Sequence, residues 1–193
     1  NKTLFMEIVI ILGLIFLNGI LSMSEIAMVS ARKSRLETAA KKGSKTAKTA
    51  LRLANEPDRF LSTIQIGITL IGILTGLYSG EALAGDLARW LETIGIPQAH
   101  SLTLAKGIIV ILVTYLTLIL GELVPKHLGM NAPEKIARLI ARPMEVLSKI
   151  ASPFVWLLSA STQAVIRLTG LHASTENKVT EEEIKAIIQE GTE

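Results

Sequence analysis

Three long apolar stretches separated by polar segments dominate the pattern of this chain. They cover residues 4–29, 60–78 and 102–124, and each is long and apolar enough to cross a bilayer as a helix. The first exceeds the apolar core of a signal peptide and is followed by further spans, so we expect it to be retained. The pattern predicts an all-α membrane protein with three transmembrane helices per subunit, plus cytoplasmic juxtamembrane or interfacial helices.

The segments between the spans have their own periodicity. Residues 32–59 place alanines and leucines at helical intervals among lysines, which predicts an amphipathic helix on the inner membrane surface, with a break at Lys42-Gly43-Ser44. Residues 79–101 read as an external connection, in which a short amphipathic piece at 82–94 ends at Gly95 and Pro97. We therefore expect each connection to contain helix of its own.

Prolines mark the end of the third span and the segment that follows. Pro125 lies four residues after Gly121 and lacks the N–H that would bond the Gly121 carbonyl, so we predict that the helix bends or stops there. Pro143 and Pro153 are predicted to divide residues 132–170 into short, half-buried helices on the cytoplasmic side. A fourth span at 144–168 remains an alternative, because that stretch is apolar although charged and hydroxyl residues interrupt it.

The last stretch changes character from apolar to acidic. Thr180 and Glu183 have the spacing of a capping box before an apolar run, which predicts a helix at the end of the chain. The expected organisation is a transmembrane domain at 1–131, juxtamembrane helices at 132–170, and an acidic linker at 171–193 toward a soluble region that the chain lacks.

The asymmetry of charge predicts orientation. The net charge is +3, yet residues 32–59 hold nine Lys or Arg against three acids, whereas residues 79–101 hold Arg89 against three acids. Basic loops stay in the cytoplasm, so the amino terminus is predicted outside, in a bacterial plasma membrane. These basic residues flank spans and lack interleaved aromatics, which disfavours nucleic acid as a partner.

Composition disfavours an enzyme. Cysteine is absent, so no thiolate metal site or cysteine nucleophile exists in this chain. His100, His127 and His172 lack metal-ligand spacing, and no catalytic triad or phosphate-binding loop is apparent. We predict no catalytic residues.

The candidate chemistry lies in polar groups within the spans. Glu25 and Glu122 follow or interrupt apolar runs, and a carboxylate inside hydrocarbon costs about 2.5 to 3.5 kcal/mol unless it faces protein or water. Asn18, Ser22 and Glu25 recur at helical spacing, which puts hard oxygen donors on one face. Mg²⁺ and Ca²⁺ prefer such donors, so we predict cation handling within the membrane. Lys126 is a candidate partner for Glu122 when no ion is bound.

Three motifs resemble the CNNM/CorC family, also known as haemolysin-C-like. They are the run Asn18-Gly19-Ile20-Leu21-Ser22-Met23-Ser24-Glu25-Ile26-Ala27, the Gly121-Glu122-Leu123-Val124-Pro125-Lys126 segment, and the Thr-Glu-Glu-Glu-Ile tail. The resemblance implies a homodimeric domain with three spans, normally followed by CBS modules that bind ATP and that this chain lacks. It implies Mg²⁺ export, commonly driven by Na⁺, with Mg²⁺ as the bound substrate ion. Carried over by position, the metal ligands are Asn18, Ser22, the Gly121 carbonyl and Glu122.

The second span departs from the family pattern. Where members often show two asparagines four residues apart, this chain has Ile68 and Gly72, with Gln65, Thr69 or Thr75 as candidate replacements. Two alternatives to Mg²⁺ export follow. One is a transporter of organic cations such as polyamines; the other is a membrane anchor and dimerisation module, in which both carboxylates are interfacial.

Overall fold

The computed structural model describes residues 2–170 and 181–191. Its elements are α1 (Lys2–Ser30), α2 (Lys33–Lys41), α3 (Lys45–Asn55), α4 (Pro57–Tyr78), η1 (Ser79–Leu83), α5 (Ala84–Thr93), α6 (Gln98–Leu118), η2 (Ile119–Leu123), α7 (Val124–Asn131), α8 (Pro133–Leu168) and α9 (Glu181–Glu190), where η1 and η2 are π-helical turns. The chain forms two compact units, Asn1–Ser152 and Pro153–Glu193, and the boundary falls inside α8. The capping-box residue Thr180 lies outside the described residues.

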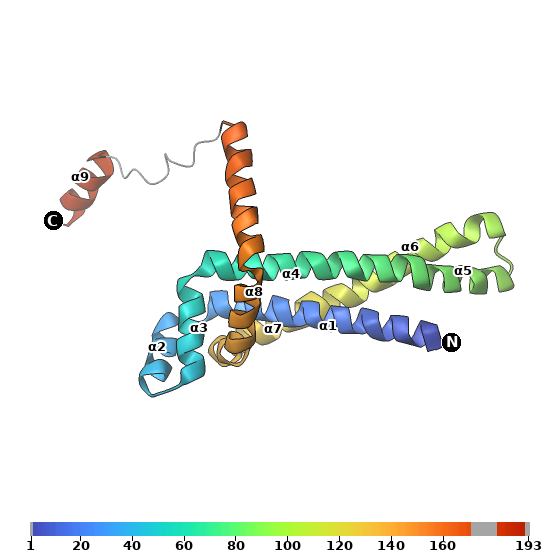
Figure 1. The fold of residues 1–193 in the computed structure, drawn as a ribbon, viewed down its shortest axis with the longest axis horizontal. Helices are drawn as coiled ribbons and strands as arrows, with labels where there is room; N and C mark the ends of the chain where they lie inside the picture. Colours follow the sequence, from blue (N-terminus) through green and yellow to red (C-terminus); the bar gives the residue numbers. More distant parts are fainter. Residues whose placement is uncertain (1, 171–180, 192–193) are drawn as a thin grey trace. The chain divides into compact units, whose positions relative to one another are not determined.

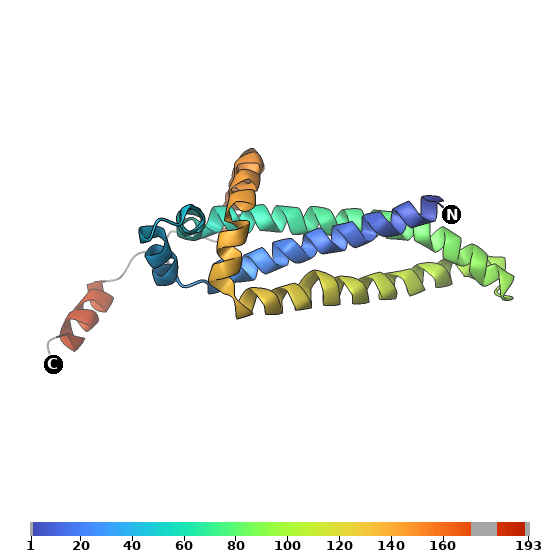
Figure 2. The ribbon, with the colours of Figure 1, turned by 90° about the horizontal axis from the view of Figure 1, so that it is seen from below.

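Three stretches of the described chain are long and apolar enough to span a membrane, as the hydropathy predicts. They are Lys2–Ser30, Pro57–Thr93 and Gln98–Asn131. These long helices run lengthwise beside one another (Figures 1 and 2), with α1 in contact with both α4 and α7. The second and third contain 37 and 34 residues, which correspond to about 56 and about 51 Å at 1.5 Å per residue, so their ends extend beyond a hydrocarbon core of about 30 Å. The predicted all-α membrane fold is confirmed.

The third long helix does not stop at Pro125, contrary to one of the two outcomes that the sequence predicts. The backbone N–H of Val124 donates to the Ile119 carbonyl, five residues back, which widens the turn at η2. Pro125 then occupies the first turn of α7. Because a proline is tolerated in the first turn of a helix, the π-helical turn lets the chain continue to Asn131.

The segment between the first two spans forms a pair of short helices. The predicted break is confirmed: Gly43 has φ 99°, a conformation that favours glycine, and it separates α2 from α3. Ser44 caps α3 by accepting from the Ala47 N–H at 3.2 Å. The same hydroxyl accepts from the Arg138 guanidinium at 3.0 Å, which ties the hairpin to α8.

The prediction that Pro143 and Pro153 divide residues 132–170 into short helices is wrong. One helix of 36 residues, α8, passes through both prolines. Each interior proline costs roughly 3 kcal/mol. The stripe that includes Ala137, Ile140 and Met144 is buried on the core of the first unit, and this burial favours a continuous helix across Pro143. The alternative of a fourth span is not supported, because α8 is not among the three span candidates in the described chain.

Glu134 at the start of α8 links this helix to the hairpin. Burial opposes its ionisation, but hydrogen bonds from the backbone N–H groups of Glu134 and Arg32, together with the charge of Arg35, hold the pKa of this carboxyl below its ordinary value. The Arg32 N–H bond measures 3.3 Å and the Arg35 ion pair 3.8 Å. The contact joins residues about 100 positions apart in the sequence.

Glycines set the closest approach of α1 to the third long helix. A Cβ on Gly129 of α7 would lie 2.8 Å from the Met23 backbone oxygen, and a Cβ on Gly19 would lie 3.0 Å from the Leu120 oxygen. Small residues allow this approach in membrane helices. The contact holds the Asn18 and Glu122 region of the two helices together.

Candidate cation site between the three long helices

A cavity of about 370 Å³ opens between the three long helices, and we call it the span cavity. Each long helix contributes to its wall: Ile15 and Asn18 from the first, Ile71, Gly72, Thr75, Gly76 and Ser79 from the second, and Val110, Val113, Thr114, Thr117, Leu118 and Glu122 from the third. Glu122 is the one ionisable residue among these lining residues. The wall therefore combines a single carboxylate with neutral oxygens and apolar side chains.

Asn18 and Gly121 meet through a direct hydrogen bond. The Asn18 Nδ2 donates to the Gly121 carbonyl at 3.0 Å, within a buried contact. Because a carbonyl can only accept, this bond fixes the amide orientation and leaves the Asn18 Oδ1 as a free acceptor. The Gly121 carbonyl, which Pro125 cannot bond, is thus engaged by Asn18 and is less open to an ion than the sequence suggested.

Glu122 lines the span cavity without a counter-charge. It is half-buried, and its carboxylate makes no ion pair or hydrogen bond within the described part of the chain. The pairing with Lys126 is not present; Lys126 is exposed. An unpaired carboxylate between membrane helices is costly unless water or a cation accompanies it. This makes Glu122 the centre of the candidate site.

Hydroxyl groups of the second long helix point their protons at the backbone. Thr75 donates to the Ile71 carbonyl at 2.8 Å, and Ser79 donates to the Thr75 carbonyl at 2.7 Å. The donor hydrogens are occupied, so the oxygens are left with lone pairs available to a cation. Ser79 lies in η1 and Glu122 lies in η2, and π-helical turns of this kind recur at functional sites.

The structure separates the other predicted residues from the span cavity. Ser22 is buried on α1, with 2% of its surface exposed, but it does not line the cavity, and neither does Glu25. Of the three candidate replacements in the second span, Thr75 lines the cavity. Gln65 and Thr69 instead hydrogen-bond to each other at 3.2 Å on an exposed face.

Sequence reasoning missed Ser79, Thr114 and Thr117. Ser79 lies in the predicted external connection, residues 79–101, because the apolar run ends before it. The two threonines lie in a mostly apolar span, and hydropathy alone does not show which face of that span meets the cavity. A hydroxyl four residues after Thr75 is the one local signal that could have extended the polar stripe to Ser79.

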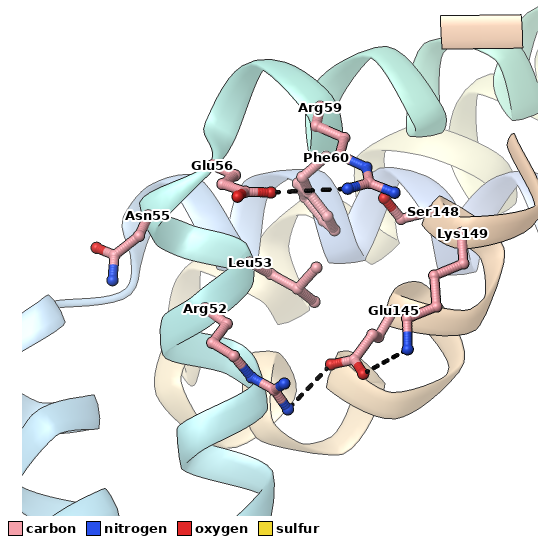
Figure 3. A pocket seen from close by; sticks show the side chains of 9 residues that line it. All are labelled: Arg52, Leu53, Asn55, Glu56, Arg59, Phe60, Glu145, Ser148 and Lys149. Atoms are coloured by element: carbon pink, nitrogen blue, oxygen red, sulfur yellow. Dashed lines mark ion pairs between the residues drawn. The ribbon is translucent and has the colours of Figure 1, made fainter. Parts of the chain in front are cut away.

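A second cavity, at the opposite end of α4, contains carboxylates that are already paired with cationic side chains. It measures about 320 Å³ and lies where α3, α4 and α8 meet (Figure 3). Glu145 pairs with Arg52 at 3.3 Å and with Lys149 at 3.4 Å, and Glu56 pairs with Arg59 at 3.9 Å. Its carboxylates already have cationic partners, so the span cavity is the better candidate for an added cation.

The donor set limits what the span cavity can bind. One carboxylate and several neutral oxygens suit a cation that keeps part of its water, as Mg²⁺ does, because a dehydrated divalent ion needs more negative ligands. No cluster of three or more His, Cys, Asp or Glu with metal-binding geometry occurs in residues 2–170 and 181–191. The site is therefore unlike a carboxylate cage.

Comparison with known proteins places these features in a family. The chain is 46% identical over its full length to UPF0053 protein sll0260 of Synechocystis, and 31% identical over 96% of its length to UPF0053 protein YhdT of Bacillus subtilis. It is 29% identical over 96% of its length to a protein of Escherichia coli named polyamine export protein. The chain covers 43%, 41% and 41% of these relatives, so it spans less than half their length. The model of the Cyclin M transmembrane N-terminal domain matches residues 9–193, and the chain belongs to this CNNM family.

Proposed function

We propose that this chain forms the cation-translocating part of a membrane transporter, with the cation held in the span cavity. The observation that carries the proposal is the unpaired Glu122 carboxylate in a residue that lines, together with Asn18 and Ser79, a cavity between three span-length helices. A positive ion offsets the cost of that carboxylate more effectively than water alone. Membership of the CNNM family and the export role in the names of two relatives support transport.

Mg²⁺ is the first substrate that we propose. A volume of about 370 Å³ accommodates an ion with its inner water shell, and Mg²⁺ is commonly held through one or two carboxylates with several waters retained. Asn18 and Glu122 would contact the ion or its waters from two helices, and the hydroxyls of Thr75 and Ser79 would do so from the third. The resemblance implies a ligand role for Ser22 and the Gly121 carbonyl as well. Ser22 does not line the cavity and the Gly121 carbonyl is bonded by Asn18, so both would bind the ion only after the helices rearrange.

A polyamine is the second candidate, favoured by the apolar part of the wall. Ile71, Val110 and Val113 would contact the methylene groups of an alkyl diamine while Glu122 pairs with one ammonium. Relatives from Haemophilus influenzae and Escherichia coli, 30% and 29% identical, carry the name polyamine export protein. Homodimerisation, sodium coupling and control by ATP stay predictions of the family resemblance.

Flux measured with the intact protein in liposomes tests the proposal. Glu122→Gln keeps the shape of the side chain and removes its charge, so it should abolish Mg²⁺ flux. Glu25→Gln removes an equal charge away from the span cavity and serves as the matched control. Normal flux by Glu122→Gln would refute the site. If the protein transports putrescine but not Mg²⁺, and Glu122→Gln abolishes the putrescine flux, the substrate is a polyamine.

A further inference from the structure

A basic cavity lies between α3 and α8, beside the second cavity, with which it shares Arg52 and Glu145. It has a volume of about 460 Å³, and four cationic side chains line it: Lys45, Lys48 and Arg52 from α3, and Arg142 from α8. Glu145 is the one carboxylate among its lining residues. Four positive groups against one negative group leave a formal excess of three positive charges around one hollow. We call it the basic cavity.

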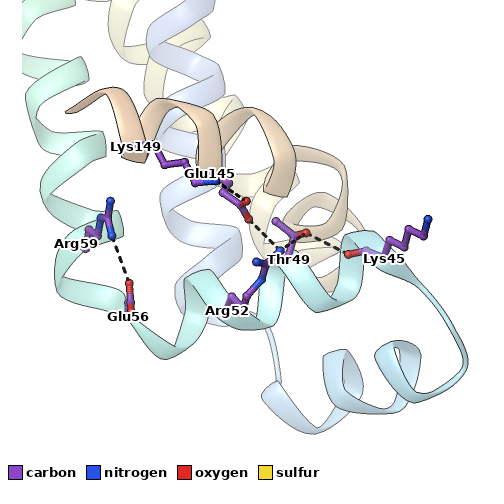
Figure 4. A network of polar contacts seen from close by, with 7 residues as sticks. All are labelled: Lys45, Thr49, Arg52, Glu56, Arg59, Glu145 and Lys149. Carbon is purple, nitrogen blue, oxygen red and sulfur yellow. Dashed lines mark hydrogen bonds and ion pairs between the residues drawn. The ribbon is translucent and has the colours of Figure 1, made fainter. Parts of the chain in front are cut away.

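The single carboxylate does not neutralise these cations. Glu145 is shared between Arg52 at 3.3 Å and Lys149 at 3.4 Å (Figure 4). Lys45, Lys48 and Arg142 are exposed and form no ion pair within residues 2–170 and 181–191. Like charges so close together repel one another, so the basic cavity attracts an anion.

Part of the basic cavity is organised before any anion binds. Thr49 is buried, and its hydroxyl donates to the Lys45 carbonyl at 3.2 Å and accepts from the Arg52 guanidinium at 3.3 Å. Arg52 is thus held from two sides, by Thr49 and by Glu145. These two contacts restrict the arginine although 69% of its side chain is exposed, so ordering it on an anion costs less entropy.

The placement of α3 indicates where the anion comes from. Helix α3 runs across the end of α4 in Figure 1 and is seen nearly end-on in Figure 2, so it lies roughly perpendicular to the long helices. One residue, Glu56, separates it from Pro57, where the second span begins. We expect a helix next to the start of a span to lie near the lipid headgroups, where anionic phosphates are concentrated.

We propose that the basic cavity binds the phosphate of an anionic phospholipid in the leaflet beside the α2–α3 hairpin. Guanidinium groups match the geometry of phosphate oxygens, and the lysines add charge without demanding a fixed direction. Arg142 and Lys48 come from α8 and α3, so a phosphate bound by both would join the two helices. This proposal is independent of the substrate of the span cavity, because it concerns lipid binding and not flux.

Thermal unfolding of the intact protein in mixed detergent micelles tests the proposal. Phosphatidylglycerol should raise the unfolding temperature in a saturable way, whereas phosphatidylcholine should not. Lys45→Gln/Lys48→Gln should raise the lipid concentration needed for half of this stabilisation about 30-fold, because each lysine beside the bound phosphate contributes about 5-fold. Lys41→Gln/Lys42→Gln is the matched control, since it removes two exposed charges just before α3 that do not line the cavity.

The arms of the experiment separate the sources of phosphate. Retained stabilisation in Lys41→Gln/Lys42→Gln with loss in Lys45→Gln/Lys48→Gln supports the basic cavity as a lipid site. Equal stabilisation by soluble glycerol phosphate, with the same variant pattern, overturns the lipid assignment and makes a soluble phosphate compound the ligand. Equal weakening in both double variants, or no weakening in either, overturns the proposal.

Discussion

The close contact between α1 and α7 gives a stability prediction that the structure makes quantitative. A Cβ on Gly129 would lie 2.8 Å from the Met23 backbone oxygen and would also collide with the Ile26 side chain. Ordinary contacts begin at 3.4 Å, so Gly129→Ala requires the Met23 backbone to withdraw by about 0.6 Å. A side chain could rotate away, but this oxygen moves only if the two helices separate.

The expected cost follows from that displacement. Forcing extra volume into a packed contact typically costs about 1 to 3 kcal/mol. Each kcal/mol lowers the unfolding temperature by roughly 2 to 4 °C for a protein of this size, so Gly129→Ala should unfold about 2 to 12 °C lower. Alanine is the better helix former by about 1 kcal/mol, which offsets part of this loss.

Scanning fluorimetry of the purified protein in detergent provides the measurement, and Gly107 provides the control. A Cβ on Gly107, in the same long helix, meets nothing within 4 Å, so Gly107→Ala should be neutral or stabilising. The difference between the two variants isolates the steric cost from helix propensity. If Gly129→Ala unfolds at the same temperature as Gly107→Ala, the close approach of α1 to α7 is incorrect.

Three further predictions address the site, a surface contact and orientation. Ser79→Ala removes a cavity oxygen and should lower cation flux several-fold, whereas Gln65→Ala, on an exposed face, should leave flux unchanged; the reverse result would move the site to the other face of α4. Glu134 has a depressed pKa in the folded state, so its contribution to stability is present above its ordinary value of 4.5 and is lost as pH falls through the lower folded pKa. Glu134→Gln should remove that part of the pH dependence, and unfolding curves that keep it would assign the effect to another group. Because the chain has no cysteine, Lys42→Cys and Gln98→Cys can be labelled singly; we expect impermeant maleimide to reach only Gln98→Cys from outside intact cells, and the opposite pattern would invert the topology.

Local rules of sequence succeed where the physical cause is local. Each predicted span lies within one long helix; the spans are 4–29, 60–78 and 102–124. Where water is absent, the backbone N–H and C=O groups of an apolar segment must hydrogen-bond to one another, and a helix achieves this within the segment. The break at Gly43 was also predictable, since a positive φ favours glycine whatever surrounds it. The same rules fail at Pro143, where packing of neighbouring buried residues keeps α8 continuous.

The candidate site was also predictable only in the part that depends on local sequence. The sequence by itself determined that Asn18 and Glu122 are polar groups in costly surroundings, because hydropathy measures that cost without reference to neighbours. Only the tertiary structure decided that both face one cavity with Ser79, while Ser22, a single helical turn from Asn18, does not line it. The rotation of each helix about its axis depends on contacts with other helices, such as those at Gly19 and Gly129, and residues more than 100 positions apart make those contacts.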